Sequence, residues 1–399
     1  MIYRFATCTL DTDTHRFMRA GKPVHVEPQV FDLLRMLADS NGRLVTKDDL
    51  VETVWRGMSV SDSTISARIN AARTAVGDTG AAQAIIKTVH GRGFQLIAEV
   101  GTDAAASAPQ VATNPAERQS IRFVPSTKGA RIATAQSGSG PPLVRVGHWL
   151  SHLELDWHSP VWLPLLQALG QDNTLIRYDQ RGTGLSSRDL AGADLETFVD
   201  DLERVADAHG LDRFPVFAAS QAVPVAIRFA VRCPERVSGL VLYGGYAQGR
   251  ALRDLAPDDI KEDTVLGLIR AGWGKADSAF MNAFSTLFMP DATPAQMDDF
   301  VKMQLVTIAP ENAAELRQIV DRFDVRAQLP LLRAPTLVVH ALGDAIQPIE
   351  QGRILASEIP DARFLPLDSR NHIPLPQQGS WAHMMQETGQ FLENMCRAR

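Results

Sequence analysis

The stretch FPVFAASQAVPVAIRFA, residues 214–230, places a single serine between two different patterns. The apolar run before Ser220 predicts a buried strand, and the spacing of the apolar residues after it predicts a helix. A serine at a sharp turn from strand to helix can present its hydroxyl for attack on a carbonyl carbon. Ala218 and Ala222 are small enough for such a turn to form. The stretch therefore raises the hypothesis that Ser220 is a nucleophile.

Strand-like runs alternate with helical patterns from residue 121 to the end of the sequence. The runs that we expect to be strands are IRFVP, ARIATAQS, PPLVRVG, NTLIRYD, PVFAAS, VSGLVLYG, PTLVVHA and ARFLPLD. Their alternation with helices indicates an α/β fold, in which a mostly parallel sheet is covered by helices. Residues 247–329 interrupt the alternation after the sixth run with a long block of helical patterns.

Four short motifs lie at the ends of these predicted strands. They are YDQRGTGLSS at 178–187, AASQA at 218–222, HALGDAIQP at 340–348 and SRNHIPL at 369–375. On these motifs, residues 121–399 resemble the α/β-hydrolase family. The resemblance implies a nucleophile, an acid and a histidine in the chain order Ser220, Asp344 and His372. It also implies that the helical block at 247–329 is a lid.

The α/β-hydrolase resemblance gives each of these groups a role in acyl transfer. Ser220 would attack a carbonyl, His372 would take the serine proton, and Asp344 would hold the imidazole in the required tautomer. The oxyanion hole would be formed by the backbone N–H groups of Gln221 and Trp149. A paired histidine and aspartate can instead be structural and brace two loops, so this second interpretation stays open.

The sequence departs from the family pattern at two places. Ala218 and Ala222 replace both glycines of the nucleophile motif, which leaves less room in a tight turn. His148 stands where the family has a glycine in the oxyanion loop, so the backbone there has less conformational freedom. We therefore expect Ser220 to be placed for attack, while its surroundings favour holding a ligand.

The helical block carries many aromatic and methionine side chains. They are Trp273, Phe280, Met281, Phe284, Phe288, Met289, Phe300 and Met303. At helical spacing such a stripe is more often core than pocket. Part of it must still roof the space above Ser220, because lids lie there. The sequence thus predicts a pocket for a small apolar or aromatic molecule that carries a carbonyl or carboxyl group.

Residues 1–100 follow a different pattern. VEPQVFDLLRMLADSNG, TKDDLVETVW and SDSTISARINAARTAVGD predict three helices, and AIIKTVHGRGFQLIAEV predicts two strands joined by a turn. Thr46 is the expected N-cap of the second helix, and Gly77 ends the third. Two short helices, a turn, a polar-faced third helix and a basic hairpin form a winged helix-turn-helix. This segment resembles the OmpR/PhoB-type DNA-binding domain.

The OmpR/PhoB resemblance implies that the helix at 61–76 enters the major groove of double-stranded DNA, while basic groups meet phosphates. The residues expected at the DNA are Thr64, Ser66 and Ala67 facing bases, Trp55, Arg68 and Arg73 near phosphates, and Thr88, His90 and Arg92 on the wing. Asn70 and Ala71 stand where family members often carry further arginines, so we expect weak binding by a monomer. Taken alone, the helix would favour an ordinary solvated role, and the wing together with the order of the whole domain shifts the interpretation to DNA binding.

Composition narrows the classes of protein to which this sequence can belong. The net charge is −6, but residues 1–100 hold 12 Lys and Arg against 11 Asp and Glu, so the acidic excess lies in the rest of the chain. Cys8, Cys233 and Cys396 are odd in number and lack zinc-binding spacing, which indicates reduced thiols in a cytoplasmic protein. No apolar run approaches the roughly 20 residues of a membrane span. We expect no membrane contact, metal or cofactor.

Residues 101–120, GTDAAASAPQVATNPAERQS, are rich in Ala, Ser, Thr and Pro and predict a linker between the two segments. Three functions are consistent with this organisation. The chain could be a ligand-responsive transcription regulator that acts as a homodimer, an active serine esterase with an auxiliary DNA-binding domain, or a protein whose winged helix binds another protein. We favour the regulator, because the nucleophile turn and the oxyanion loop are both altered.

Overall fold

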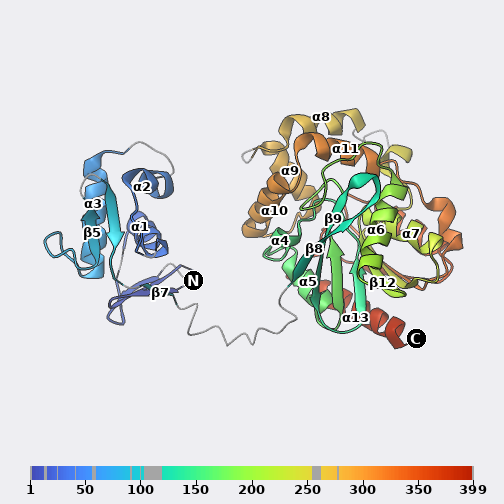
Figure 1. Ribbon diagram of the computed structural model, residues 1–399, viewed down its shortest axis with the longest axis horizontal. Coiled ribbons are helices and arrows are strands. Elements are labelled where there is room, and N and C mark those ends of the chain that lie inside the picture. Colours follow the sequence, from blue (N-terminus) through green and yellow to red (C-terminus); the bar gives the residue numbers. More distant parts are fainter. Residues whose placement is uncertain are drawn as a thin grey trace. The chain divides into compact units, whose positions relative to one another are not determined.

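The computed structural model describes residues 2–12, 16–24, 26–40, 42–55, 60–89, 92–98, 100–102, 119–253, 262–275 and 278–397. The chain divides into two compact units, Met1–Ala112 and Thr113–Arg399. Each unit is described by itself (Figure 1). Of the linker expected at 101–120, residues 103–118 lie outside the described residues.

The first unit contains a five-stranded antiparallel sheet. Its strands are β1 (Ile2–Phe5), β2 (Cys8–Asp11), β3 (Arg16–Arg19), β4 (Lys22–Pro23) and β7 (Val100–Thr102), in the order β4-β3-β2-β1-β7. Strand β7 returns after the hairpin and pairs with β1 from Phe5↔Val100 to Tyr3↔Thr102. The sheet therefore includes two residues, 101 and 102, of the segment that the sequence assigned to the linker.

Three helices and a hairpin complete the first unit, as the sequence predicted. They are α1 (Pro28–Asp39), α2 (Lys47–Val54) and α3 (Asp62–Val76), followed by β5 (Ile86–Val89) and β6 (Gly93–Leu96). Thr46 caps α2 in a reciprocal pair of hydrogen bonds with Asp49, and Gly77 ends α3 in a left-handed conformation with φ of 80°. On α3, Ile65 and Ile69 are buried in a core shared with α1.

The second unit is built on an eight-stranded sheet. Its strands are β8 (Ser120–Pro125), β9 (Arg131–Gly138), β10 (Pro142–Arg145), β11 (Thr174–Tyr178), β12 (Phe214–Ala219), β13 (Val237–Tyr243), β14 (Thr336–Ala341) and β15 (Ala362–Leu367). The order is β15-β14-β13-β12-β10-β11-β9-β8; the β8–β9 and β9–β11 pairs are antiparallel, and the other pairs are parallel. All eight predicted strands are present.

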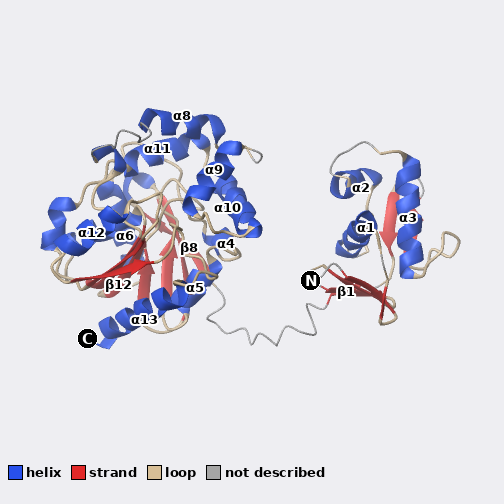
Figure 2. Cartoon of the chain, turned by 180° about the vertical axis from the view of Figure 1, so that it is seen from behind, coloured by secondary structure: helices blue, strands red, loops and turns tan. Residues whose placement is uncertain are grey.

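Helices cover both faces of this sheet. They are α4 (Leu153–Asp156), α5 (Leu163–Gly170), α6 (Leu195–Ala208), α7 (Ala222–Arg232), α12 (Ile349–Glu358) and α13 (Trp381–Arg397). The two views show α6 and α7 on one face and α5 with α13 on the other (Figures 1 and 2). The main apolar core lies between the strands and these helices.

The helical block expected at 247–329 contributes α8 (Glu262–Gly272), α9 (Ala279–Phe288), α10 (Pro294–Thr307) and α11 (Pro310–Val320). In both views these helices gather beyond one end of the sheet (Figures 1 and 2). Because β10, β12, β14 and β15 run parallel, the loops that follow them open at one edge of the sheet. The carboxyl ends of these strands therefore carry the candidate site.

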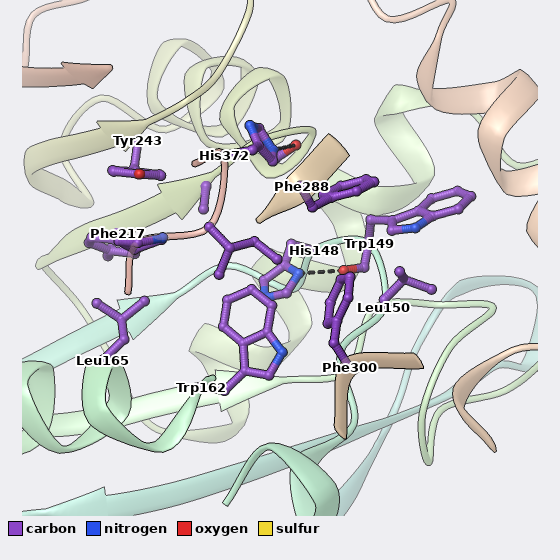
Figure 3. Close-up of a pocket in the computed structure, with 14 residues that line it drawn as sticks. His148, Trp149, Leu150, Trp162, Leu165, Phe217, Tyr243, Phe288, Phe300 and His372 are labelled. Carbon is purple, nitrogen blue, oxygen red and sulfur yellow. Dashed lines mark hydrogen bonds between the residues drawn. The ribbon is translucent and has the colours of Figure 1, made fainter. Parts of the chain in front are cut away.

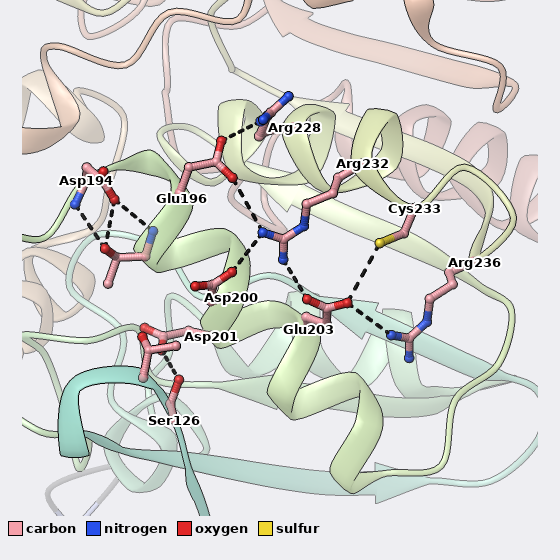
Figure 4. A network of polar contacts seen from close by, with 12 residues as sticks. Ser126, Asp194, Glu196, Asp200, Asp201, Glu203, Arg228, Arg232, Cys233 and Arg236 are labelled. Atoms are coloured by element: carbon pink, nitrogen blue, oxygen red, sulfur yellow. Dashed lines mark hydrogen bonds and ion pairs between the residues drawn. The ribbon is translucent and has the colours of Figure 1, made fainter.

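Ion pairs join α6 to α7 and to the loop that follows it (Figure 4). Arg232 contacts Asp200 and Glu203 at 2.7 Å each, and Arg236 contacts Asp207 at 2.8 Å. These groups are partly exposed, so each pair contributes little alone, but the shared partners make a network. The network fixes α7, whose first turn follows Ser220.

Gly184, in the RGTGLS segment, occupies a position that a larger residue cannot fill. Its φ is +53°, and a Cβ atom there would lie 2.1 Å from Asp179 Oδ2 and 2.7 Å from the Ser151 carbonyl. Asp179 Oδ2 accepts hydrogen bonds from the backbone N–H groups of Leu185 and Leu153. We expect Gly184→Ala to lower the free energy of unfolding by about 2–4 kcal/mol, measured by chemical denaturation.

Gly267→Ala is the matched control, because a Cβ atom at Gly267 meets open space within α8. That change should leave the free energy of unfolding unchanged or raise it by up to about 1 kcal/mol. Equal destabilisation by the two substitutions would contradict the steric explanation.

Candidate functional site

Ser220 lies in the turn between β12 and α7, as the sequence predicted. Its φ is +55°, in the left-handed region that costs a non-glycine residue roughly 1–3 kcal/mol. The Ser220 N–H donates to the Tyr243 carbonyl at 2.9 Å, and the Val223 N–H donates to the Ser220 carbonyl at 3.0 Å. Ala218 and Ala222 are fully buried. The turn thus forms with alanine at both glycine positions of the family pattern.

His372 bridges Ser220 and Asp344. Its Nε2 lies 2.8 Å from Ser220 Oγ, and its Nδ1 lies 2.7 Å from Asp344 Oδ2. The other oxygen of Asp344 accepts the backbone N–H groups of Ile346 and Gln347 at 2.8 and 2.9 Å. This arrangement can remove the serine proton through Nε2 while the carboxylate holds Nδ1–H.

The Asp344 carboxyl is in its charged form at neutral pH. Burial alone would raise its pKa, but His372 and the Gln347 N–H outweigh burial, so the pKa lies below its usual value. The stabilisation that this shift represents is present at neutral pH and is lost as the pH falls through the lowered pKa. An ionised Asp344 selects the His372 tautomer that leaves Nε2 free to accept the serine proton.

The backbone N–H groups of Trp149 and Gln221 have no hydrogen-bond partner among the described residues. Both therefore remain available as oxyanion donors. His148 does not adopt a positive φ, so its replacement of glycine causes no backbone strain. The left-handed residue of this loop is Leu150, with φ of +63°. Gly147 is the glycine that the loop needs, because a Cβ atom there would lie 2.9 Å from the Gln180 nitrogen.

His148 holds the oxyanion loop through both ring nitrogens. Its Nε2 accepts from Arg145 Nη2, because a guanidinium can only donate, and its Nδ1–H therefore donates to the Trp149 carbonyl. Burial and the adjacent Arg145 lower the pKa of His148 well below its usual value, so the ring is neutral. The histidine fixes the orientation of the peptide group that follows Trp149.

The pocket above Ser220 is small and apolar (Figure 3). Its cavity volume is about 30 Å³, room for about one water molecule. Side chains around the serine include Leu165, Phe217, Tyr243, Phe288, Phe300 and Ile373. Of the aromatic and methionine residues expected in the lid, Phe288 and Phe300 line the pocket. Most of the others, such as Trp273 and Met281, belong to the core.

The lid holds the loop that carries His372. The Phe288 carbonyl, at the end of α9, accepts the backbone N–H groups of His372 at 2.9 Å and Ile373 at 3.2 Å. Asn371 and Asp291 exchange two further hydrogen bonds, at 3.0 and 3.1 Å. The Phe288 ring also stands edge-on to the imidazole, with 5.6 Å between centroids. Any displacement of Phe288 therefore acts directly on the histidine.

In the first unit, one face of α3 is exposed and uncharged. Its residues are Ser63, Ser66, Ala67, Asn70 and Thr74, which recur at helical spacing. Thr64, also expected at the bases, is half-buried. Asn70 was not among the expected DNA contacts, although an Asn side chain can pair with adenine in the major groove. The sequence contained a signal for Asn70, because residues four apart lie on the same helix face and Ser66 was an expected base contact.

Two of the expected phosphate contacts are buried instead. Trp55 is 3% exposed and packs in the core of the unit. Arg73 is 6% exposed, and its guanidinium donates to the Ile86 carbonyl and to Thr88 Oγ1 at 2.8 Å. These expectations are wrong, because both side chains hold the helices and hairpin together. Thr88 is accordingly occupied as the acceptor of Arg73.

The remaining basic residues differ in their exposure and in whether they form an ion pair within the unit. Arg68 forms an ion pair with Glu27 and donates to Gln29 at 3.0 Å, so its charge is partly neutralised within the unit. Arg92 and Lys87 are exposed on the hairpin. His90 lies outside the described residues. The hairpin thus supplies the basic side chains that are exposed enough to contact phosphates.

Comparison with known families identifies both units. Residues 149–377, more than half of the chain, match the family described as alpha/beta hydrolase fold. Residues 21–96 match the family described as transcriptional regulatory protein, C terminal, an OmpR/PhoB-type winged-helix DNA-binding domain. The chain therefore belongs to the α/β-hydrolase fold family and carries a DNA-binding domain of transcriptional regulators.

Individual relatives of the second unit are hydrolases. The chain is 28% identical over 214 residues to RutD of Azorhizobium caulinodans, assigned by its name to the carbamate hydrolases, covering 53% of this chain and 78% of RutD. It is 28% identical over 249 residues to a pimeloyl-[acyl-carrier protein] methyl ester esterase of Nitrosomonas europaea, covering 61% and 94%. An esterase structure from Thermogutta terrifontis shares the fold, with a TM-score of 0.57, 21% identity and coverage of 69% and 99%.

Among the described residues, none of the helices is sufficiently long and apolar to span a membrane. Within the same residues, His, Cys, Asp and Glu side chains form no group of three or more that could bind a metal ion.

The geometry around Ser220 predicts that this serine alone reacts with a serine-directed phosphonate. Incubation of the full-length protein with a p-nitrophenyl phosphonate should add one label at Ser220, located by peptide mass spectrometry. Asp344→Asn should slow labelling by at least about 10²-fold, because the imidazole loses the carboxylate that orients it.

Ser357→Ala, an exposed serine at the end of α12, is the control and should be labelled at the unchanged rate. Labelling of another residue, or an unchanged rate in Asp344→Asn, would show that the three side chains form only a structural contact.

The structure of the first unit predicts that substitution of one arginine affects DNA binding and that substitution of another affects stability. Arg92→Ala should weaken DNA binding at all sequences and reduce the salt dependence of binding by about one phosphate contact, with no change in thermal unfolding. Arg73→Ala should lower the free energy of unfolding of the unit by about 1–3 kcal/mol, because the Ile86 carbonyl loses its partner. Fluorescence anisotropy over a salt series and calorimetry would measure both. Reduced salt dependence with unchanged stability in Arg73→Ala would reverse the assignment.

Proposed function

We propose that this protein is a ligand-responsive transcriptional regulator. It binds double-stranded DNA through α3 and the β5–β6 hairpin, and it receives a small apolar or aromatic molecule with a carbonyl or carboxyl group in the pocket above Ser220. The observation that carries the proposal is the contact between the wall of a small apolar pocket and the lid, on a chain that also holds a DNA-binding domain.

The size of the pocket supports a role in sensing. A cavity of about 30 Å³ is far smaller than the several hundred Å³ typical of ligand pockets, so we infer that a ligand becomes enclosed only when roof side chains such as Phe288 or Phe300 move. Movement of Phe288 perturbs the hydrogen bonds that its carbonyl accepts from the backbone N–H groups of His372 and Ile373. Binding therefore favours a second arrangement of lid and loop, and that difference is what a sensor requires.

The exposed face of α3 supports action as a dimer. That face offers hydroxyl and amide groups without a cation, so a single domain gains little electrostatic attraction there. Two domains that bind two half-sites add their contacts, and their spacing becomes the variable that a ligand can change. A coupling free energy of about 1–3 kcal/mol between ligand and DNA would be typical.

Serine esterase activity is the second candidate. It is favoured by the distances of 2.8 and 2.7 Å that link Ser220, His372 and Asp344, and by the hydrolase names of the relatives. The two functions are compatible, because slow hydrolysis of a bound ester would end its signal. In that case the same pocket would both detect the ligand and remove it.

Electrophoretic mobility shifts on the DNA upstream of the protein's own gene test the regulator. The unmodified protein and the protein phosphonylated at Ser220, as a mimic of the occupied pocket, should both distinguish this DNA from a scrambled sequence at roughly physiological ionic strength. Their affinities should differ by about 5- to 150-fold.

Failure of both forms to distinguish the two DNAs would refute regulation at this site. Equal affinity of the two forms would refute the sensing role while leaving DNA binding intact. Ser220→Ala, treated with the same reagent, is the control and should show no shift in affinity.

A further inference from the structure

Two tryptophans that line the pocket carry indole N–H groups for which the described part of the chain offers no hydrogen-bond partner. Trp149 and Trp162 both line the cavity, and their side chains are only 7% and 5% exposed. The Nε1 atoms of both are buried without an acceptor. A buried donor without a partner destabilises the folded state, so a pair of them beside one small cavity calls for an explanation.

Trp162 cannot easily turn to find an acceptor elsewhere. Its ring lies 4.8 Å from the His148 ring, between centroids, and the Arg145 guanidinium carbon stands 5.3 Å from the ring centre. Trp162 is also the residue directly before α5, which fixes its backbone. Figure 3 shows the indole beside His148 at the base of the pocket. The ring of Trp162 is therefore held in position by its neighbours before any ligand arrives.

The other polar groups of the pocket are already engaged. His148 uses both ring nitrogens, with Arg145 and with the Trp149 carbonyl. His372 and Ser220 bond to each other, and the Tyr243 hydroxyl donates to the Asn371 carbonyl at 3.4 Å. Among the described residues that line the cavity, the two indole N–H groups are the buried side-chain polar groups without a partner, and both are donors.

A carbonyl group held above Ser220 would use the two backbone donors and leave both indoles unpaired. We propose that the ligand is an ester or lactone that carries a second acceptor oxygen, as a ketone or a carboxylate, and that the Trp162 indole N–H binds this second oxygen, with Trp149 as an auxiliary donor. This inference rests on the proposed function of the pocket and makes Trp162 its specificity-determining residue. Ligands with amine or hydroxyl donors at that place gain nothing, because the indoles cannot accept.

Three small esters of similar length test the inference. Methyl 4-oxopentanoate carries a ketone as the second acceptor, monomethyl succinate carries a carboxylate, and methyl pentanoate has a methylene group instead. Their dissociation constants would be measured by ligand-observed NMR on full-length Ser220→Ala, which prevents turnover. At least one of the two oxygen-bearing esters should bind roughly threefold to tenfold more tightly than methyl pentanoate.

The preference should depend on the indole donor. Trp162→Phe, added to Ser220→Ala, keeps an aromatic ring and should remove most of the preference, and a further Trp149→Phe should remove the remainder. Trp157→Phe is the matched control, because Trp157 is outside this cavity and packs on Arg177, and it should keep the full preference. Comparison of the ketone with the carboxylate identifies which acceptor the site prefers.

Equal binding of all three esters, no binding of any of them, or a preference that survives in the double tryptophan variant would overturn the inference. The proposed function fails separately if the preferred ester binds with the expected dependence on Trp162 but leaves the mobility of the DNA complex unchanged.

Discussion

The hydrogen bonds from the His372 and Ile373 backbone N–H groups to the Phe288 carbonyl are the contact on which the site depends. They join the last residue of α9 to the loop that places the imidazole against Ser220 and Asp344. The same phenylalanine closes the pocket with its side chain. One residue of the lid therefore takes part both in shaping the cavity and in positioning the histidine, and the two properties cannot change independently.

The sequence predicted the sheet and the site at its edge because both leave local signals. Apolar runs locate the strands, and the motifs around Ser220, Asp344 and His372 lie where parallel strands end. His148 was the uncertain position, since a missing glycine suggests a strained loop. In the structure the left-handed backbone conformation lies two residues later, at Leu150, and nothing in the sequence marks that position.

The DNA-binding residues were harder to predict, since burial of a long side chain depends on its tertiary partners. Arg73 lies off the apolar face of α3, and only the position of β5 shows that its guanidinium meets the Ile86 carbonyl. Trp55 follows a polar helix and gives no periodic signal. The volume of the pocket and the unpaired indoles of Trp149 and Trp162 also required three-dimensional packing, because neither follows from residue spacing.

Strand β7 is the last described element of the first unit, and it lies in a different part of the unit from α3, the helix expected at the DNA. The chain leaves the unit through backbone pairing with β1, while α3 is held by the core and by the Arg73 contact with β5. A displacement transmitted along the chain would therefore reach the sheet of the first unit through β7 before it reaches α3. Under the proposed function, such a displacement would change the position of the domain, while the fold of α3 would depend on its own core.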